Sequence, residues 1–170
     1  MKTKFWITAA AALILQIVVF NGLGSFVRYI PYLGLWGVVF YPPSRNNTLY
    51  LLVAFLLGLT LDLSMGTGGI FAGASLVYAF FRPLWLQWIV PDYFDNPSDF
   101  AFWEANRIFL YSLAGNLLLT VFIYFFDSLS MGRLVADLHH IWRHGLLNFF
   151  FLTLYTYLFY WNNLYKLRQP

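Results

Sequence analysis

The stretch from Leu51 to Gly73 sets the strongest limit on how this chain folds, because it holds one carboxylate in an apolar run. Ala54, Gly58, Asp62 and Gly66 follow one another at intervals of four residues, so a helix stacks them on one face. Small residues at this spacing let the backbone of another helix approach closely, as in helix packing within lipid. We therefore expect a helix with a tightly packed face.

A cluster of glycines follows Asp62 and predicts a tight turn that leads into a second, closely packed helix. The cluster comprises Gly66, Gly68, Gly69 and Gly73. Asp62 has two interpretations. It is either a functional group, such as a proton or ion relay or a contact to a partner helix, or a cap of the turn or helix that begins near Gly68.

The composition of the whole chain indicates an integral membrane protein. Of its 170 residues, 61% are hydrophobic and 10% are charged, which leaves too few polar side chains to cover a soluble globule. Aromatic residues make up 22%, and many lie near the ends of apolar runs, as interfacial belts require. The absence of cysteine excludes disulfides, thiolate metal sites and cysteine nucleophiles.

The apolar runs predict an all-α bundle of about six transmembrane helices, in one domain over residues 1–170. Five of them are expected at about residues 5–20, 49–63, 69–90, 108–126 and 145–160. A further run at about 26–41 is short for a crossing, which needs roughly 20 residues. It either crosses thinly or dips into the membrane and returns, and we expect a crossing.

The distribution of basic residues predicts the orientation of this bundle. Six crossings place most of the lysines and arginines on the side of both termini, namely Lys2, Lys4, Arg45, Arg82, Arg107, Lys166 and Arg168. This excess predicts cytoplasmic termini, a cytoplasmic polar loop at about 91–107 and a periplasmic one at about 127–143. The net charge of +3 is thus topology information and does not indicate nucleic-acid binding. Arg82 is expected to reach toward the interface beside a kink at Pro83.

Two polar clusters have possible chemical roles that we consider weak. His140 and His144 are four residues apart and could share a metal ion with Asp137, but a histidine at an aqueous edge, such as His139, needs no metal. The acids of the first loop are explained by solvation rather than by paired-carboxylate chemistry. They are Asp92, Asp95, Asp99 and Glu104.

Catalytic motifs are missing from the sequence. We find no phosphate-binding loop, nucleophile elbow, zinc-protease motif or haem motif, so we expect no enzymatic activity and no cofactor. Asn116 is expected to form a hydrogen bond between helices, which tunes packing without defining a site.

Residues 50–81 strongly resemble the MreD family of rod shape-determining proteins. The pattern of that family is roughly A-F-x2-G-[LF]-x2-D-x6-G, followed by a helix of small residues. Here it is matched by Ala54, Phe55, Gly58, Leu59, Asp62 and Gly69. The match covers about a fifth of the chain, and outside it only the size and the hydropathy layout agree.

The resemblance implies a non-enzymatic scaffold of the cell-wall elongation machinery in the bacterial inner membrane, which helps to maintain cell shape and to direct peptidoglycan synthesis. It implies binding to MreC, a single-span partner with a periplasmic domain. MreB, RodA and a class B penicillin-binding protein are implied in the wider complex. The candidate partner-binding or helix-packing residues are Ala54, Phe55, Gly58, Asp62, Gly66, Gly69 and Gly73.

The family is also similar in architecture to the six-helix substrate-binding subunits of energy-coupling-factor vitamin transporters. This implies an alternative function, a small-molecule binding subunit, in which polar side chains from several spans converge on a pocket. Asn21, Asp62 and Asn116 are the candidates. A third alternative, proton-coupled transport through Asp62, lacks a second acid or histidine to pass the proton on.

Overall fold

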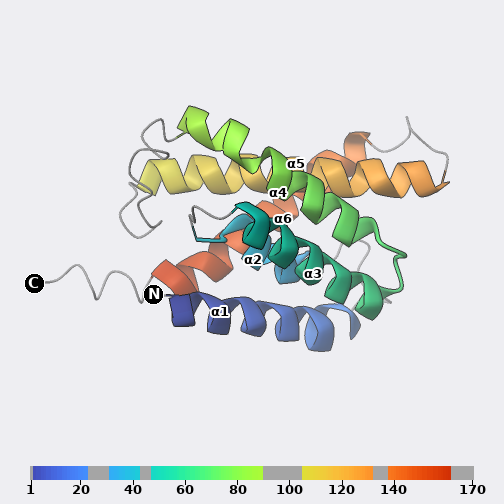
Figure 1. Ribbon diagram of the computed structural model, residues 1–170, viewed down its shortest axis with the longest axis horizontal. Coiled ribbons are helices and arrows are strands. Elements are labelled where there is room, and N and C mark those ends of the chain that lie inside the picture. Colours follow the sequence, from blue (N-terminus) through green and yellow to red (C-terminus); the bar gives the residue numbers. More distant parts are fainter. Residues whose placement is uncertain (1, 23–30, 43–46, 90–104, 132–137, 162–170) are drawn as a thin grey trace, which may run out of the picture.

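The computed structural model describes residues 2–22, 31–42, 47–89, 105–131 and 138–161 (Figure 1). Within these ranges the chain is helical and contains α1 (Lys2–Leu15), α2 (Trp36–Val39), α3 (Asn47–Met65), α4 (Ile70–Ile89), α5 (Ala105–Met131) and α6 (Leu138–Tyr155). Three short elements extend or precede them: the π-helical turns η1 (Gln16–Phe20) and η6 (Thr156–Trp161), which continue α1 and α6, and the 3-10 turn η3 (Leu33–Leu35) before α2.

Four long helices follow one another through the bundle, with α3 against α4, α4 against α5 and α5 against α6. Helix α1 lies along the other side, and α2 lies in the middle (Figure 1). Helix α2 contacts α1, α3 and α5, and η3 contacts α1, α3 and α6. The short η3–α2 segment is therefore enclosed by longer helices.

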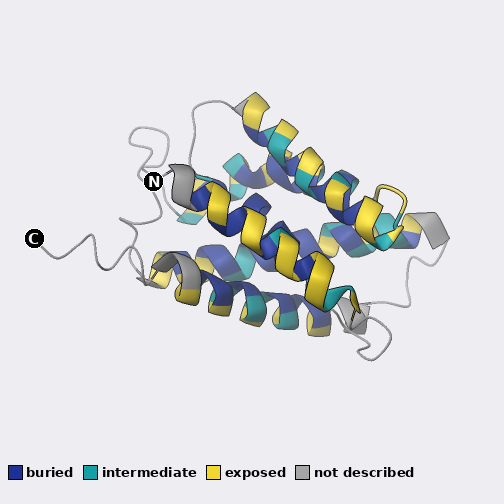
Figure 2. Ribbon diagram, turned by 90° about the horizontal axis from the view of Figure 1, so that it is seen from below, coloured by how far each residue is buried: buried dark blue, intermediate teal, exposed yellow. Residues whose placement is uncertain are grey.

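The centre of the bundle is mostly apolar, and so is its outer surface. Every residue from 33 to 41 is buried, and Leu35, Trp36 and Val39 are completely covered. The helix faces that meet are buried, while the outer faces are exposed (Figure 2). Large apolar side chains on those outer faces include Leu63, which is 78% exposed, and Trp88, which is 89% exposed.

Two helices of the described ranges are long and apolar enough to cross a membrane, judged by length and composition. These stretches are Thr48–Met65 in α3 and Asn106–Leu129 in α5. The expected bundle of six crossings is not confirmed. In the described part of the run at 26–41, the helical turns reach only from Leu33 to Val39, well short of the roughly 17–25 residues of a crossing.

Two sequence predictions on helix ends need correction. Helix α5 continues to Met131 and α6 begins at Leu138, so most of the polar loop expected at 127–143 is helical. Among the described polar side chains of this stretch, Asp127 is half-buried and Arg143 is exposed, and the buried Ser128 hydroxyl donates to the Phe125 carbonyl oxygen at 2.9 Å. Residues 105–107 of the other expected loop begin α5, and its four acids lie outside the described residues.

Arg82 departs from its expected position at the membrane interface. Helix α4 runs through Pro83, and the Arg82 side chain is only 4% exposed. It points into the bundle, where the Tyr41 carbonyl oxygen and the Tyr111 hydroxyl accept its hydrogen bonds.

Candidate functional site

Asp62 caps the first turn of α4 from the end of α3. Its Oδ1 accepts a hydrogen bond from the Phe71 backbone N–H at 3.0 Å, and its Oδ2 accepts one from the Ala72 N–H at 2.7 Å. The Thr67 hydroxyl also donates to Oδ1. The first N–H groups of a helix have no partner within it, and an anion is favourable at that end. The capping interpretation of Asp62 is therefore confirmed.

Gly58 lies one helical turn before Asp62, where α3 and α4 pack closely. A Cβ atom added at Gly58 would lie 2.5 Å from the Phe71 carbonyl oxygen and 2.6 Å from the Ala72 Cα atom. No real Cβ atom tolerates such a contact, and backbone atoms cannot move aside as side chains do. Glycine at this position lets the two backbones approach, which also brings Phe71 and Ala72 within reach of Asp62.

The other candidate residues of this stretch lie in different places. Ala54 is completely buried on the same face as Gly58, whereas Phe55 is 38% exposed on the outside of α3. Gly66 is not part of the packed face as expected, because α3 ends at Met65. Its φ of +69° ends the helix, and its N–H donates to the Asp62 carbonyl oxygen at 2.8 Å.

Gly69 and Gly73 differ from each other in role. Gly69 is exposed in the turn with a φ of +101°, a conformation that favours glycine. Gly73 faces α5 rather than α3, since an added Cβ would lie 3.2 Å from the Phe126 ring. The seven candidate residues thus lie in the α3–α4 hairpin, with Gly73 at its contact with α5. Only Ala54, Gly58 and Asp62 share the packed face of α3.

We expect Asp62→Ala to lower the free energy of unfolding by about 2 kcal/mol, because it leaves two buried N–H groups without an acceptor. Asp62→Asn keeps one acceptor oxygen and should lose about half as much. Denaturant unfolding in mixed micelles measures both. Thr67→Val, which removes only the hydroxyl donor, is the matched control with a smaller loss. An Asp62→Ala protein that unfolds at the parent midpoint contradicts the cap.

Besides the polar centre at Asp62 and the α4 N–H groups, a second one lies at the carboxyl end of α2, where Arg82 is buried. Its Nη2 donates to the Tyr41 carbonyl oxygen at 2.6 Å, and its Nε donates to the Tyr111 hydroxyl at 2.8 Å. The Tyr111 hydroxyl in turn donates to the Val39 carbonyl oxygen. The Arg82 guanidinium also lies 4.8 Å from the centre of the Tyr50 ring.

Tyr50 completes this centre, since its hydroxyl donates to the Val38 carbonyl oxygen at 2.8 Å. The last carbonyl groups of a helix lack partners within it, and burial without partners is costly. Residues from α3, α4 and α5 thus satisfy the carboxyl end of α2, and the Arg82 charge suits the negative end of a helix.

At the amino end of the η3–α2 segment, side chains from other helices likewise form hydrogen bonds with the backbone. The Gln16 side-chain carbonyl accepts from the Leu33 N–H at 2.7 Å, and that of Asn148 accepts from the Tyr32 N–H at 2.8 Å. In the middle, the Trp36 indole N–H donates to the Thr156 hydroxyl at 2.8 Å. Backbone inside an apolar bundle needs such partners, which is why these polar residues are buried.

The sequence did not predict that these residues form hydrogen bonds with the η3–α2 segment. Gln16 and Arg82 carried a signal, because each interrupts a long apolar run, where polar groups are rare without a partner. Tyr50 and Tyr111 carried none, since tyrosine is common in interfacial belts.

His144 is buried and contacts aromatic residues. Its Nδ1 lies 2.9 Å from the Tyr124 hydroxyl, and its ring centre lies 4.5 Å from that of Tyr32. The side chains of Asp137, His139 and His140 lie outside the described residues. Among the residues that are described, no three His, Cys, Asp or Glu side chains gather as a metal ion requires.

The three polar residues considered for a solute site have separate hydrogen-bond partners. Asn21 donates to the Ser64 hydroxyl at 3.2 Å, and Asp62 caps α4. Asn116 donates to the Ser112 carbonyl oxygen in its own helix at 2.7 Å, so the expected bond between helices is wrong for this residue. Links between α5 and α6 come instead from Ser112 with Thr153 and from Asn148 to Thr120.

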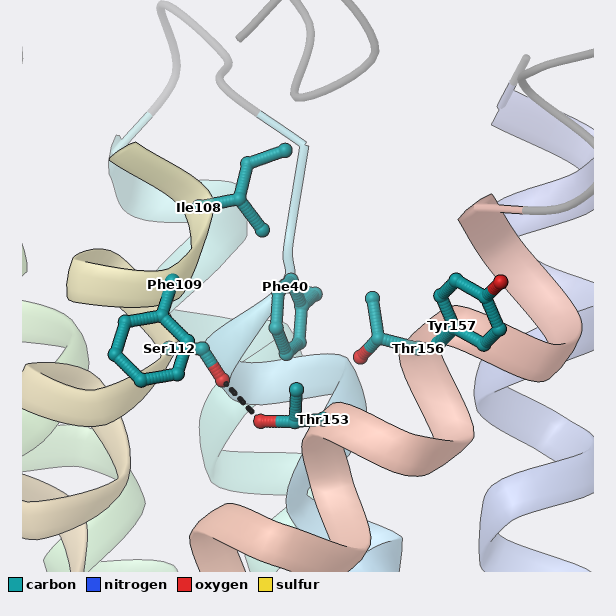
Figure 3. Close-up of a pocket in the computed structure, with 7 residues that line it drawn as sticks. All are labelled: Phe40, Ile108, Phe109, Ser112, Thr153, Thr156 and Tyr157. Carbon is teal, nitrogen blue, oxygen red and sulfur yellow. Dashed lines mark hydrogen bonds between the residues drawn. The ribbon is translucent and has the colours of Figure 1, made fainter. Parts of the chain in front are cut away.

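A cavity of about 320 Å³ lies between α5 and the α6–η6 helix (Figure 3). Phe109 and Ser112 line it from α5, Thr153 and Tyr157 line it from the other side, and Phe40 lies between them. Its lining is mostly hydrocarbon, which differs from the convergent polar groups that a vitamin-like solute needs.

No protein-family model, curated protein or solved structure matches the chain. Inferences about its function therefore rest on its residues and their geometry.

In both polar centres, the side chains form hydrogen bonds with backbone groups of neighbouring segments. The Asp62 carboxylate is occupied by N–H groups of α4, and Arg82 and the two tyrosines are engaged with carbonyl groups around α2. Such an arrangement fixes the relative positions of helices, which is a packing role.

Proposed function

We propose that the chain is a multi-pass protein of the bacterial inner membrane and a non-enzymatic scaffold of the cell-wall elongation machinery, as the resemblance to the MreD family implies. One observation carries the proposal: the resembling residues are used for architecture. Gly58 permits the α3–α4 contact and Asp62 caps α4 across it. A scaffold depends on a fixed outer shape, and these residues determine the shape of this hairpin.

Membrane embedding is supported by the apolar surface as well as by composition. Two helices are long and apolar enough to cross, and apolar side chains such as Leu63 and Trp88 project from the bundle. In water such a surface would be an aggregation liability, whereas in lipid it needs no cover. The proposal of cytoplasmic termini depends on six crossings, because only then are the lysine and arginine residues in excess on the side of both termini.

The proposed direct partner is MreC, with MreB, RodA and a class B penicillin-binding protein in the wider complex. Because α4 contacts Gly58 and Asp62 and Ala54 is completely buried, this face has no room for a partner helix. We propose that the hairpin supports the docking surface, and that the partner helix packs on exposed outer faces.

Affinity purification from native membranes tests this function. The tagged chain is expected to bring down a single-span protein with a periplasmic domain, and depletion of the chain is expected to round rod-shaped cells. A tagged multi-pass protein of similar size is the control for nonspecific capture. Recovery of no such partner, together with unchanged cell shape, contradicts the proposal. A thermal shift with a vitamin-sized ligand that Asp62→Asn abolishes would favour the transport alternative.

A further inference from the structure

The cavity between α5 and η6 is open to the outer surface of the bundle. Two of its lining residues, Phe109 and Tyr157, are 51% and 64% exposed, whereas Phe40 at its inner end is 1% exposed. It therefore forms a groove that runs from the surface to the core (Figure 3). Its volume of about 320 Å³ is within the roughly 300–1,000 Å³ of small-ligand sites.

The hydroxyl groups of the serine and the two threonines that line the groove are already hydrogen-bonded within the protein. Ser112 and Thr153 bond to each other at 3.1 Å (Figure 3). Thr156 donates to the Leu152 carbonyl oxygen at 2.7 Å and accepts from the Trp36 indole at 2.8 Å. In the inner part of the groove, away from the exposed Tyr157, a ligand with polar groups would lose its bonds to water and gain few in return, so this part favours hydrocarbon.

The surroundings of the groove match a phospholipid. Leu110 and Leu154, on the same two helices, are 54% and 43% exposed, so the groove is continuous with an apolar outer surface. Arg107 is exposed in the first turn of α5, next to Ile108 of the groove lining. Basic residues near the membrane surface attract anionic lipids, so Arg107 favours a phospholipid over other apolar occupants.

We propose that this groove holds an acyl chain of a membrane phospholipid, with Arg107 near its phosphate. The inference rests on the proposed membrane embedding, and it adds a specific lipid site to the scaffold. The acyl chain lies against Phe40 and so contacts the residue that directly follows α2. Lipid occupancy thus supports the packing between α5, α6 and the enclosed segment.

Native mass spectrometry of protein extracted in mild detergent, followed by lipid identification, tests the site. The parent protein is expected to retain a phospholipid. Thr153→Phe fills the groove and should abolish retention, while Leu154→Phe, on the adjacent exposed position, should not. Arg107→Gln, which leaves the groove open, should lower retention of anionic lipid.

Photo-crosslinking from p-benzoylphenylalanine, with irradiation after detergent extraction has removed bulk lipid, identifies the occupant. Phe109 lines the groove, and Phe125 on the same helix is equally exposed, at 49%, but lies outside the groove lining. After detergent extraction, crosslinked lipid at Phe109 but not at Phe125 supports the proposal. Crosslinking of Phe109 to a protein helix overturns it.

Two further results separate this proposal from the proposed function. A parent protein that fractionates with membranes but retains no lipid, or a Thr153→Phe protein that retains it unchanged, overturns the lipid site alone. A parent protein recovered without membranes contradicts the membrane embedding itself.

Discussion

Replacing Arg82 with methionine is expected to lower the free energy of unfolding by about 3–5 kcal/mol, because two buried hydrogen bonds from a charged donor are lost. The change removes the donors to the Tyr41 carbonyl oxygen and the Tyr111 hydroxyl while nearly conserving apolar volume. A hydrogen bond to a charged group contributes about 1.5–3 kcal/mol, and two of them are lost. Denaturant titration in mixed micelles measures the difference.

Two variants separate this network from general effects on α4. Arg82→Lys keeps the charge but cannot reproduce the guanidinium fork, so an intermediate loss is expected. Phe80→Met changes an exposed residue of the same helix and should stay within about 0.5 kcal/mol of the parent. Equal midpoints for Arg82→Met and the parent would show that the carboxyl end of α2 does not depend on Arg82.

Replacing Gly58 with alanine is expected to cost about 1–3 kcal/mol, and replacing it with leucine should cost more. The added Cβ meets the Phe71 carbonyl oxygen and the Ala72 Cα, so α3 and α4 must separate. Separation also lengthens the Asp62 bonds to both N–H groups. The same unfolding measurement applies, and Gly22→Ala is the control, because no heavy atom lies within 4 Å of its added Cβ.

Combining Gly58→Ala with Asp62→Ala examines whether the two residues act on one contact. Residues that share a contact show coupling of about 0.5–3 kcal/mol, so the double variant should lose less stability than the two single losses added. Additive losses would mean that the cap survives the separation of the helices. Under the proposed function, Gly58→Leu should also weaken co-purification with the single-span partner.

The hairpin of α3 and α4 was largely predictable because its causes are local. Small residues four apart, one carboxylate and a run of glycines lie within 20 residues of sequence, and these features determine a helix, a turn and a cap. The roles of individual glycines needed coordinates. Gly66 ends α3 and Gly73 faces α5, which spacing alone does not distinguish from a place on the packed face.

The sequence by itself determined the helical class, the apolar surface and the α3–α4 hairpin, since these follow from composition and short-range spacing. Only the tertiary structure decided the enclosed η3–α2 segment, whose apolar residues fit a crossing helix equally well. Its hydrogen bonds come from distant residues, from 12 positions away for Tyr50 and Val38 to 120 for Trp36 and Thr156. A short buried helix exists only where distant side chains satisfy its backbone, and that condition is met by packing rather than by local sequence.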